Sequence, residues 1–328
     1  MPSFAGSVRT WSAAGTRRLL RAPGDDSDKR TRGVVALRTG SDAYPGAAVL
    51  GVEGAWRAGS GYVRYIGPRR AADLVLARRP ETVTMGPDAE GVHAYGWVIG
   101  SGTDAATRAD SETASLRALL AGADPVVVDA GALDLLPAAN APVIATPHAG
   151  EFLRLRATLG LAELSSGALD DPSERAQAVR ETATALGGTV LLKGATTLVA
   201  DDSAVIAVAA GTPWLATAGT GDVLAGAIGA LVAADRGAGR STALAELAAA
   251  AVWLHGLAGR IASGAGAGRP GRPIVALEVA DALPAAFARV LAAERQGFAE
   301  DGDGLAVSER EQGDHEHEHD DETQEDRA

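Results

Sequence analysis

The stretch that decides the fold is "TAGTGDVLAGAIGALVA", residues 217–233, in which a glycine-containing turn leads into a long apolar run. Such a run of small and apolar residues predicts a buried helix. Its only charged residue, Asp222, stands directly behind Gly219-Thr220-Gly221, where the helix should begin. An aspartate there can simply cap the helix. Alternatively, the turn exposes backbone N–H groups toward an anion while the carboxylate performs acid–base chemistry.

Short apolar stretches alternate with helical patterns along the rest of the chain. "GVVALRT" (33–39), "PVVVDAG" (125–131) and "PVIATP" (142–147) predict buried strands, each followed by a helical pattern. Repeats of this unit predict an α/β fold with a mainly parallel sheet and helices on both faces. "TVLLKGATTLVAD" (189–201) and "VIAVAA" (205–210) instead predict consecutive strands, which form an antiparallel extension. Further predicted elements are strands at 62–67 and 95–102 and helices at 46–61, 105–121, 221–236 and 241–262.

Composition excludes several classes of protein. The chain has 328 residues, enough for a large α/β domain, and no cysteine, which excludes disulfides, thiolate metal sites and thiol nucleophiles. The most apolar long run, residues 244–259, is too short for a transmembrane helix and carries Glu246 and His255. The N-terminus lacks a secretory apolar core, so we expect a cytoplasmic protein with no membrane association.

The acidity of the chain is concentrated at its C-terminal end. The net charge is −12, but residues 299–328 alone contain 13 acidic residues and two arginines, which leaves residues 1–298 near neutrality. The folded part is therefore not a nucleic-acid binder, and the acidic end is expected to be a disordered tail. Its "HEHEH" (315–319) could bind a metal loosely, although composition favours a solvated charge run. We expect an N-terminal extension (1–25), one domain (26–298) and this tail.

Six loops should face one crevice, because ligands of parallel α/β sheets bind beyond the carboxyl ends of the strands. One of them, "KGATT" (193–197), carries Lys193, one of only two lysines in a chain with 28 arginines. Its ammonium group, with the Thr197 hydroxyl and the backbone, is predicted to contact nucleotide phosphate; the alternative is an incidental lysine in an exposed turn. The other loops are "RTGSDAYPGA", "GSGTD", "DAGALD", "TPHAGE" and "TAGTGD".

Two of these loops carry further candidate side chains. In "TPHAGE" (146–151), His148 and Glu151 are three residues apart, so on one helical turn they could hold the water shell of a Mg²⁺ ion or a polar substrate. Glu151 could equally serve only to stabilise the positive end of a helix. In "DAGALD" (129–134), Asp129 ends a strand, and we interpret it as an orienting or capping group.

The order and wording of these motifs resemble the ADP/ATP-dependent NAD(P)H-hydrate dehydratases, a family of ribokinase-like fold. The resemblance covers roughly residues 26–292, and "TPHAGEF" together with "GTGDVLAG" is specific to this family. The remaining motifs that carry it are "GSDAYPGAAVLGVEGAWRAGSG", "VIGSGTD", "PVVVDAGALDLL", "VLLKGATTLVAD" and "AAVWLHGLAG".

The resemblance implies that the chain repairs the S epimer of hydrated NADH or NADPH, with ADP or ATP as co-substrate and Mg²⁺ as cofactor. A nucleotide phosphoryl group would activate the C6 hydroxyl, and phosphate would then leave. Asp222 would take the hydroxyl proton, while Thr220 and Gly221 would meet charge on the transferring phosphoryl group. The other residues implied are Lys193, Gly194, Ala195, Thr196, Thr197 and Gly221 for the nucleotide; Ala47, Gly102, His148 and Asp222 for the hydrated cofactor; and Glu151 for the metal, through water.

The resemblance also implies a homo-oligomer, such as a tetramer, and functional pairing with a separate NAD(P)H-hydrate epimerase. Two positions depart from the family pattern. In "DKRTRG" (28–33), Asp28 and Arg30 flank Lys29 where the family has His and Gly, and Asp104 stands where Gly is common. Two other functions fit the motifs less well: a small-molecule kinase of the same fold and a non-catalytic nucleotide sensor.

Overall fold

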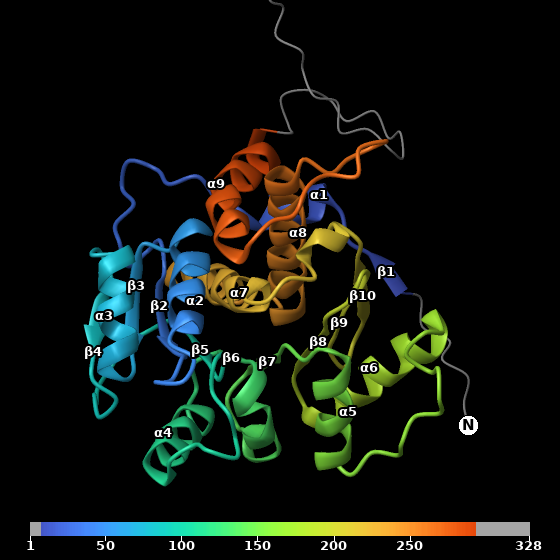
Figure 1. Ribbon diagram of the computed structural model, residues 1–328, viewed down its shortest axis with the longest axis horizontal. Coiled ribbons are helices and arrows are strands. Elements are labelled where there is room, and N and C mark those ends of the chain that lie inside the picture. Colours follow the sequence, from blue (N-terminus) through green and yellow to red (C-terminus); the bar gives the residue numbers. More distant parts are fainter. Residues whose placement is uncertain (1–7, 293–328) are drawn as a thin grey trace, which may run out of the picture.

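The computed structural model describes residues 8–292, which form a ten-stranded sheet covered by helices (Figure 1). The sheet is parallel from its middle to one edge, whereas the pairs β8–β9 and β9–β10 are antiparallel. The predicted parallel sheet with an antiparallel extension is therefore confirmed. In spatial order the strands are β1 (Val8–Thr10), β10 (Val205–Val208), β9 (Thr197–Ala200), β8 (Thr189–Leu192), β7 (Val143–Ala145), β6 (Val126–Val128), β5 (Gly96–Ile99), β2 (Val34–Arg38), β3 (Tyr62–Ile66) and β4 (Val83–Met85).

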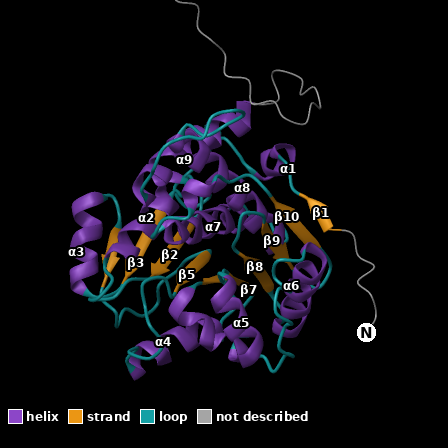
Figure 2. Cartoon of the chain, turned by 45° about the vertical axis from the view of Figure 1, so that its right-hand side comes forward, coloured by secondary structure: helices purple, strands orange, loops and turns teal. Residues whose placement is uncertain are grey.

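Helices cover both faces of the sheet, as predicted (Figures 1 and 2). Successive strand residues point to opposite faces, so in β2 Val35 and Leu37 join one hydrophobic core and Ala36 joins the other. The first core is closed by α1 (Ala13–Leu19), α2 (Gly46–Arg57), α3 (Arg69–Arg78), α7 (Thr220–Gly237), α8 (Leu244–Ser263) and α9 (Ala276–Ala292). The second is closed by α4 (Asp110–Leu120), the 3₁₀ helix η1 (Ala130–Ala138), α5 (Ala149–Thr158) and α6 (Pro172–Leu186).

Glycines bring α2 and α7 into backbone contact. A Cβ on Gly54 would lie 2.2 Å from the carbonyl oxygen of Val223, and one on Gly226 would lie 2.0 Å from that of Gly51. A larger residue at either position would clash with the backbone of the other helix, so the close approach of the two helices requires glycine at both. This contact fixes the N-terminal turn of α7 beside α2.

Some elements differ from the sequence-based expectation. Strand β1 and helix α1, within the predicted N-terminal extension, join the fold: β1 pairs in parallel with β10, and Trp11 behind it is buried. After β6 the helical stretch is the 3₁₀ helix η1, which contains Pro137 near its end. Helix α4 begins at Asp110 rather than near residue 105, since turns fill residues 105–107.

The described residues include one helix, α8, that is long and apolar enough to cross a membrane by length and composition. In the fold, 72% of that stretch is buried, which is typical of the core helix of a folded domain. The predicted acidic tail (299–328) and the domain boundary near residue 298 lie outside the described residues.

Candidate active site

The loops after the parallel strands meet at the carboxyl edge of the sheet, as predicted. The loops after β2 and β5 are joined by a hydrogen bond of 2.7 Å from the amide of Gly40 to the carbonyl oxygen of Ser101. The ends of β6, β7 and β8 are joined through Asp129, whose carboxylate accepts hydrogen bonds from Thr146 and Lys193. Residues far apart in the sequence therefore share one site.

The turn before α7 is held in one conformation. Gly219 has φ 88°, and a Cβ there would lie 2.5 Å from a leucine side chain, so only glycine fits. The hydroxyl of Thr220 lies 2.8 Å and 2.9 Å from the carbonyl oxygens of Leu215 and Thr217. No side chain caps this helix. The Thr220 amide points toward the Thr217 carbonyl oxygen at 3.4 Å, which leaves the Gly221 amide as the better placed donor to an anion.

Asp222 follows in the first turn of α7 and is half-buried. Burial is the main cause that raises the pKa of its carboxyl to about 7, the nearby charge of Asp129 raises it further, and Lys193 lowers it. Because this pKa lies near neutrality, the carboxylate can accept a proton and release it again at ordinary pH. No side chain caps the start of α7, so the structure does not support the interpretation in which Asp222 caps this helix.

Lys193 ends β8 and points its ammonium group at the same space. Its Nζ lies 3.1 Å from Oδ1 of Asp129 and 3.9 Å from Oε2 of Glu151. A Cβ built on Gly221 would lie 3.6 Å from this Nζ. The ammonium group and the first turn of α7 are therefore neighbours, and this charged corner presents one cation and the backbone N–H groups of a helix start to a phosphate.

The rest of the "KGATT" turn joins β8 to β9. Gly194 and Ala195 are exposed, Thr196 is half-buried and Thr197 is buried. The Thr197 hydroxyl donates to the carbonyl oxygen of Gly194 at 3.3 Å, so this side chain stabilises the turn itself. The guanidinium of Arg175, from α6, covers the turn, since a Cβ on Gly194 would lie 2.4 Å from its Nη2. Sequence reasoning missed Arg175, which gives no local signal.

Ala47 and Gly102 touch each other across the site edge. Gly102 has φ 67°, and a Cβ there would lie 2.3 Å from the Cβ of Ala47. Ala47 lies in the first turn of α2, and Gly102 lies in the turn after β5. The structure therefore brings these two predicted residues together.

His148 and Glu151 form a reciprocal cap at the start of helix α5. The Nδ1 atom of His148 accepts the amides of Gly150 and Glu151 at 3.1 Å and 3.4 Å, and Glu151 Oε2 accepts the His148 amide at 2.9 Å. This reciprocal cap agrees with the interpretation in which Glu151 stabilises the helix start. The His148 side chain is 57% exposed, so a ligand can reach its ring, but its Nε2 already lies 3.4 Å from Oε1 of Glu151.

The described residues contain no group of three or more His, Asp or Glu side chains that could hold a metal ion. Magnesium, however, commonly binds through one or two carboxylates together with phosphate oxygens and water. Glu151, which is 12% exposed and faces Lys193, is a carboxylate of this kind. The residues therefore fit a Mg²⁺ ion that is shared with a nucleotide.

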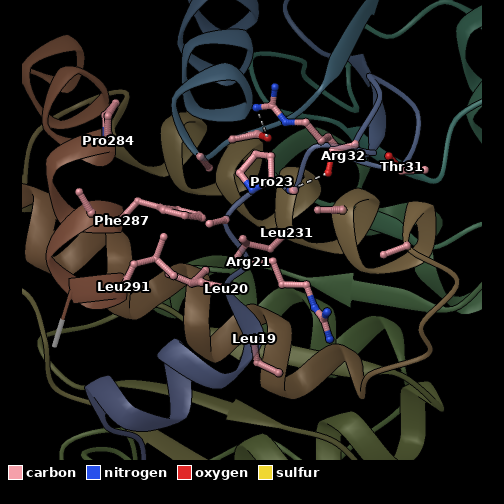
Figure 3. A pocket seen from close by; sticks show the side chains of 18 of the residues that line it. Leu19, Leu20, Arg21, Pro23, Thr31, Arg32, Leu231, Pro284, Phe287 and Leu291 are labelled. Atoms are coloured by element: carbon pink, nitrogen blue, oxygen red, sulfur yellow. Dashed lines mark hydrogen bonds between the residues drawn. The ribbon is translucent and has the colours of Figure 1, made fainter. Parts of the chain in front are cut away.

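Among the cavities of the described residues, one borders the predicted site and a larger one does not. A cavity of about 380 Å³ borders Glu151, and the residues that line it include Thr103, Asp104, Asp134 and Arg154. A larger one of about 690 Å³, shown in Figure 3, is lined by Leu20, Arg21 and Phe287 among others and by none of the predicted site residues. It lies at the C-terminal ends of α2 and α7, away from the chemistry.

His255, on α8, is a second residue whose role the sequence did not predict. It is buried, and its Nε2 lies 2.9 Å from the carbonyl oxygen of Thr220. Burial lowers the pKa of its imidazole to about 4, so the ring is neutral at pH 7 and donates this hydrogen bond. The only sequence signal was a polar residue inside an apolar helix.

The mainly parallel sheet covered by helices places the chain among the α/β proteins, and solved structures of ribokinase-like fold resemble it. The ADP/ATP-dependent NAD(P)H-hydrate dehydratase from Bacillus subtilis, co-crystallised with ATP/Mg²⁺, matches with a TM-score of 0.73 and 29% identity, covering 87% of this chain and 100% of its own. A ribokinase-like superfamily protein from Enterococcus faecalis matches with a TM-score of 0.71 and 24% identity, covering 88% and 98%, and supports the fold alone.

The chain belongs to the NAD(P)H-hydrate dehydratase family, whose profile matches residues 35–268. The ADP-dependent (S)-NAD(P)H-hydrate dehydratase from Neisseria meningitidis is 34% identical over 73% of this chain and 80% of its own length. The bifunctional NAD(P)H-hydrate repair enzyme Nnr from Mycobacterium tuberculosis is 41% identical over 67% of this chain and 45% of its own length. The chain thus spans about half the length of the bifunctional relatives that it matches.

Proposed function

We propose that the chain is an enzyme, a hydro-lyase that converts the S epimer of hydrated NADH or NADPH back to NADH or NADPH at the expense of ADP or ATP. The observation that carries the proposal is the pairing of Asp222, whose pKa lies near 7, with the charged corner of Lys193 and the start of α7. The family, and the activities named for its members, support the choice of substrate.

In the proposed reaction, Asp222 accepts the proton of the C6 hydroxyl as this oxygen attacks the terminal phosphoryl group of the nucleotide. One O–P bond forms and the phosphoanhydride bond breaks, so that ADP leaves as AMP, or ATP as ADP. The Gly221 amide and the Lys193 ammonium group stabilise the negative charge that gathers on the phosphoryl oxygens. The lone pair of the ring nitrogen then expels phosphate, and the neighbouring ring carbon loses a proton as the double bond re-forms.

The remaining predicted residues divide between the two substrates. The turn of Lys193 to Thr197 and Gly221 would bind the nucleotide. Ala47, Gly102, His148 and Asp222 would bind the hydrated cofactor. Glu151 would hold Mg²⁺ through water, and this ion would supply charge neutralisation to the phosphates when bound.

The setting of the reaction is also part of the proposal. We expect a cytoplasmic homo-oligomer, such as a tetramer, that acts on small molecules. Because the proposed reaction uses only the S epimer, the functional partner would be a separate NAD(P)H-hydrate epimerase, or spontaneous epimerisation, that supplies it from the R epimer.

The decisive experiment incubates the chain with hydrated NADH, Mg²⁺ and either ADP or ATP. The proposal predicts that the absorbance band of the reduced nicotinamide returns and that one phosphate appears for each cofactor restored. A small-molecule kinase acting on this compound would accumulate a phosphorylated product without return of the band. A nucleotide sensor would bind the nucleotide without turning it over. Either outcome would overturn the proposal.

A further inference from the structure

A buried carboxylate joins four strand ends beneath the site. Asp129 is 3% exposed at the end of β6. Its Oδ2 accepts the Ser101 hydroxyl at 2.9 Å, and its Oδ1 accepts the Thr146 hydroxyl at 2.7 Å and the Lys193 ammonium group at 3.1 Å. These three donors follow β5, β7 and β8. A carboxylate with this many donors is held in one place.

The backbone around Asp129 is equally constrained. The amide of Asp129 donates to the carbonyl oxygen of Ile99 at 3.0 Å. A Cβ on Gly100 would lie 2.1 Å from the carbonyl oxygen of Asp129. Gly100 has φ 95°, which favours glycine. The anion therefore cannot move without displacing the neighbouring strand end.

Asp129 acts on two side chains of the proposed site, Lys193 and Asp222. Among residues 8–292, the cation in contact with Asp129 is Lys193, which is 24% exposed and has a second, longer approach of 3.9 Å to Glu151. The charge of Asp129 also acts on Asp222, where it raises the pKa, while Lys193 lowers it. Two other helices approach this turn: a Cβ on Gly51 of α2 would lie 3.7 Å from the backbone oxygen of Asp222, and His255 of α8 contacts the carbonyl oxygen of Thr220. Burial keeps His255 neutral at pH 7.

We propose that Asp129 is a positioning residue: it anchors the Lys193 ammonium group beside the start of α7 and sets the balance of charge that Asp222 experiences. The part of this inference that concerns turnover rests on the proposed function, whereas the contacts of Asp129 do not depend on it. A purely structural role, in which Asp129 only ties strand ends together, is the alternative.

The isosteric variant Asp129→Asn tests the charge while keeping the size of the side chain. Asp134→Asn is the matched control, because Asp134 lies on the 3₁₀ helix η1 that directly follows Asp129, is 43% exposed and also pairs with a cation, Arg108. We expect the acid limb of the pH–rate profile to move to lower pH by about one unit in Asp129→Asn and to stay in place in Asp134→Asn. An unchanged limb in a folded Asp129→Asn protein would overturn the proposal.

Two readouts are independent of turnover. In a carbon-13 carboxyl titration without substrate, the resonance of Asp222 should titrate at lower pH in Asp129→Asn. In thermal melts, Lys193→Met should destabilise the protein, because it leaves a buried anion without its cation, and adding Asp129→Asn should restore part of the loss. A titration that does not move, or losses that simply add, would refute the positioning role even if the dehydratase assay succeeds. If that assay fails while both readouts respond, only the proposed function falls.

Discussion

The Nε2 atom of His255 lies 2.9 Å from the carbonyl oxygen of Thr220, so that α8 is hydrogen-bonded to the first residue of α7. His255 is 7% exposed, and burial lowers the pKa of its ring to about 4. A buried neutral imidazole here holds the helix start that carries both Gly221 and Asp222. The geometry of the charged corner therefore depends on a buried residue of a different helix.

Replacing His255 should loosen this helix start. In His255→Leu we expect a loss of about 1 kcal/mol or more in the free energy of unfolding, since a buried hydrogen bond is removed, together with weaker nucleotide binding. Urea unfolding and calorimetric titration with ADP measure the two effects. His93→Leu, at an exposed position, is the control. Nucleotide affinity equal to that of the parent would show that the bond does not organise the site.

Asp222 should make the protein less stable as pH rises. Its pKa in the folded state, about 7, exceeds the ordinary value of 3.8, so between these values the folded chain holds a proton that the unfolded chain releases. Stability therefore falls as pH rises from about 4 to about 7. The asparagine in Asp222→Asn does not titrate. The free energy of unfolding of this variant should therefore exceed that of the parent by up to about 4 kcal/mol above this pH range, and by little below it. Urea unfolding at both ends of the range tests this, and a pH-independent difference would contradict it.

Most of the sheet was predictable because its strands are short, apolar and buried on both faces, which fixes them by composition alone. Strand β1 was not, because its three exposed residues pair with β10 only in the folded sheet. Helix α6, which the sequence analysis did not single out, has a mixed polar surface that gives a weak periodic signal.

The sequence allowed each loop of the site to be predicted separately, but not all of the contacts between the loops. That Lys193, Asp222 and the α7 turn face one another follows from the rule for parallel sheets. The contact of Lys193 with Asp129 does not, because it joins residues 64 positions apart and depends on the order β6-β7-β8. The sequence did not decide between a ligand site and a helix cap for His148 and Glu151, because a spacing of three residues suits both.

The contact of Gly102 with Ala47 offers a matched pair of substitutions. Gly102→Ala places a methyl group 2.3 Å from the Cβ of Ala47, whereas Gly91→Ala, at almost the same positive φ, meets nothing within 4 Å. Both variants carry the backbone penalty of about 1–3 kcal/mol. Only Gly102→Ala should also raise KM for the hydrated cofactor. An equal KM in the two variants would remove this edge from the substrate site.

Lys193 should govern nucleotide binding. Lys193→Ala removes a charge-assisted contact of about 1.5–3 kcal/mol, which corresponds to roughly tenfold to hundredfold in affinity. Lys193→Arg should also weaken binding, because a larger planar group does not fit the point between Asp129 and Gly221. Calorimetry with ADP and ATP checks both variants, with the exposed Arg69→Ala as control. Equal affinity in all of them would place Lys193 outside the phosphate site.

The most direct test of the account is the pH dependence of cofactor repair in the parent and in Asp222→Asn, with folding and nucleotide binding verified for both. If Asp222 takes the proton of the hydroxyl, the parental rate should rise with pH up to its pKa of about 7. The asparagine variant should bind nucleotide, lose about 10²–10⁴-fold in rate, and show no such rise. A variant that repairs the hydrated cofactor within a few-fold of the parent, or that keeps the same pH profile, would contradict the assignment of Asp222 as the proton acceptor.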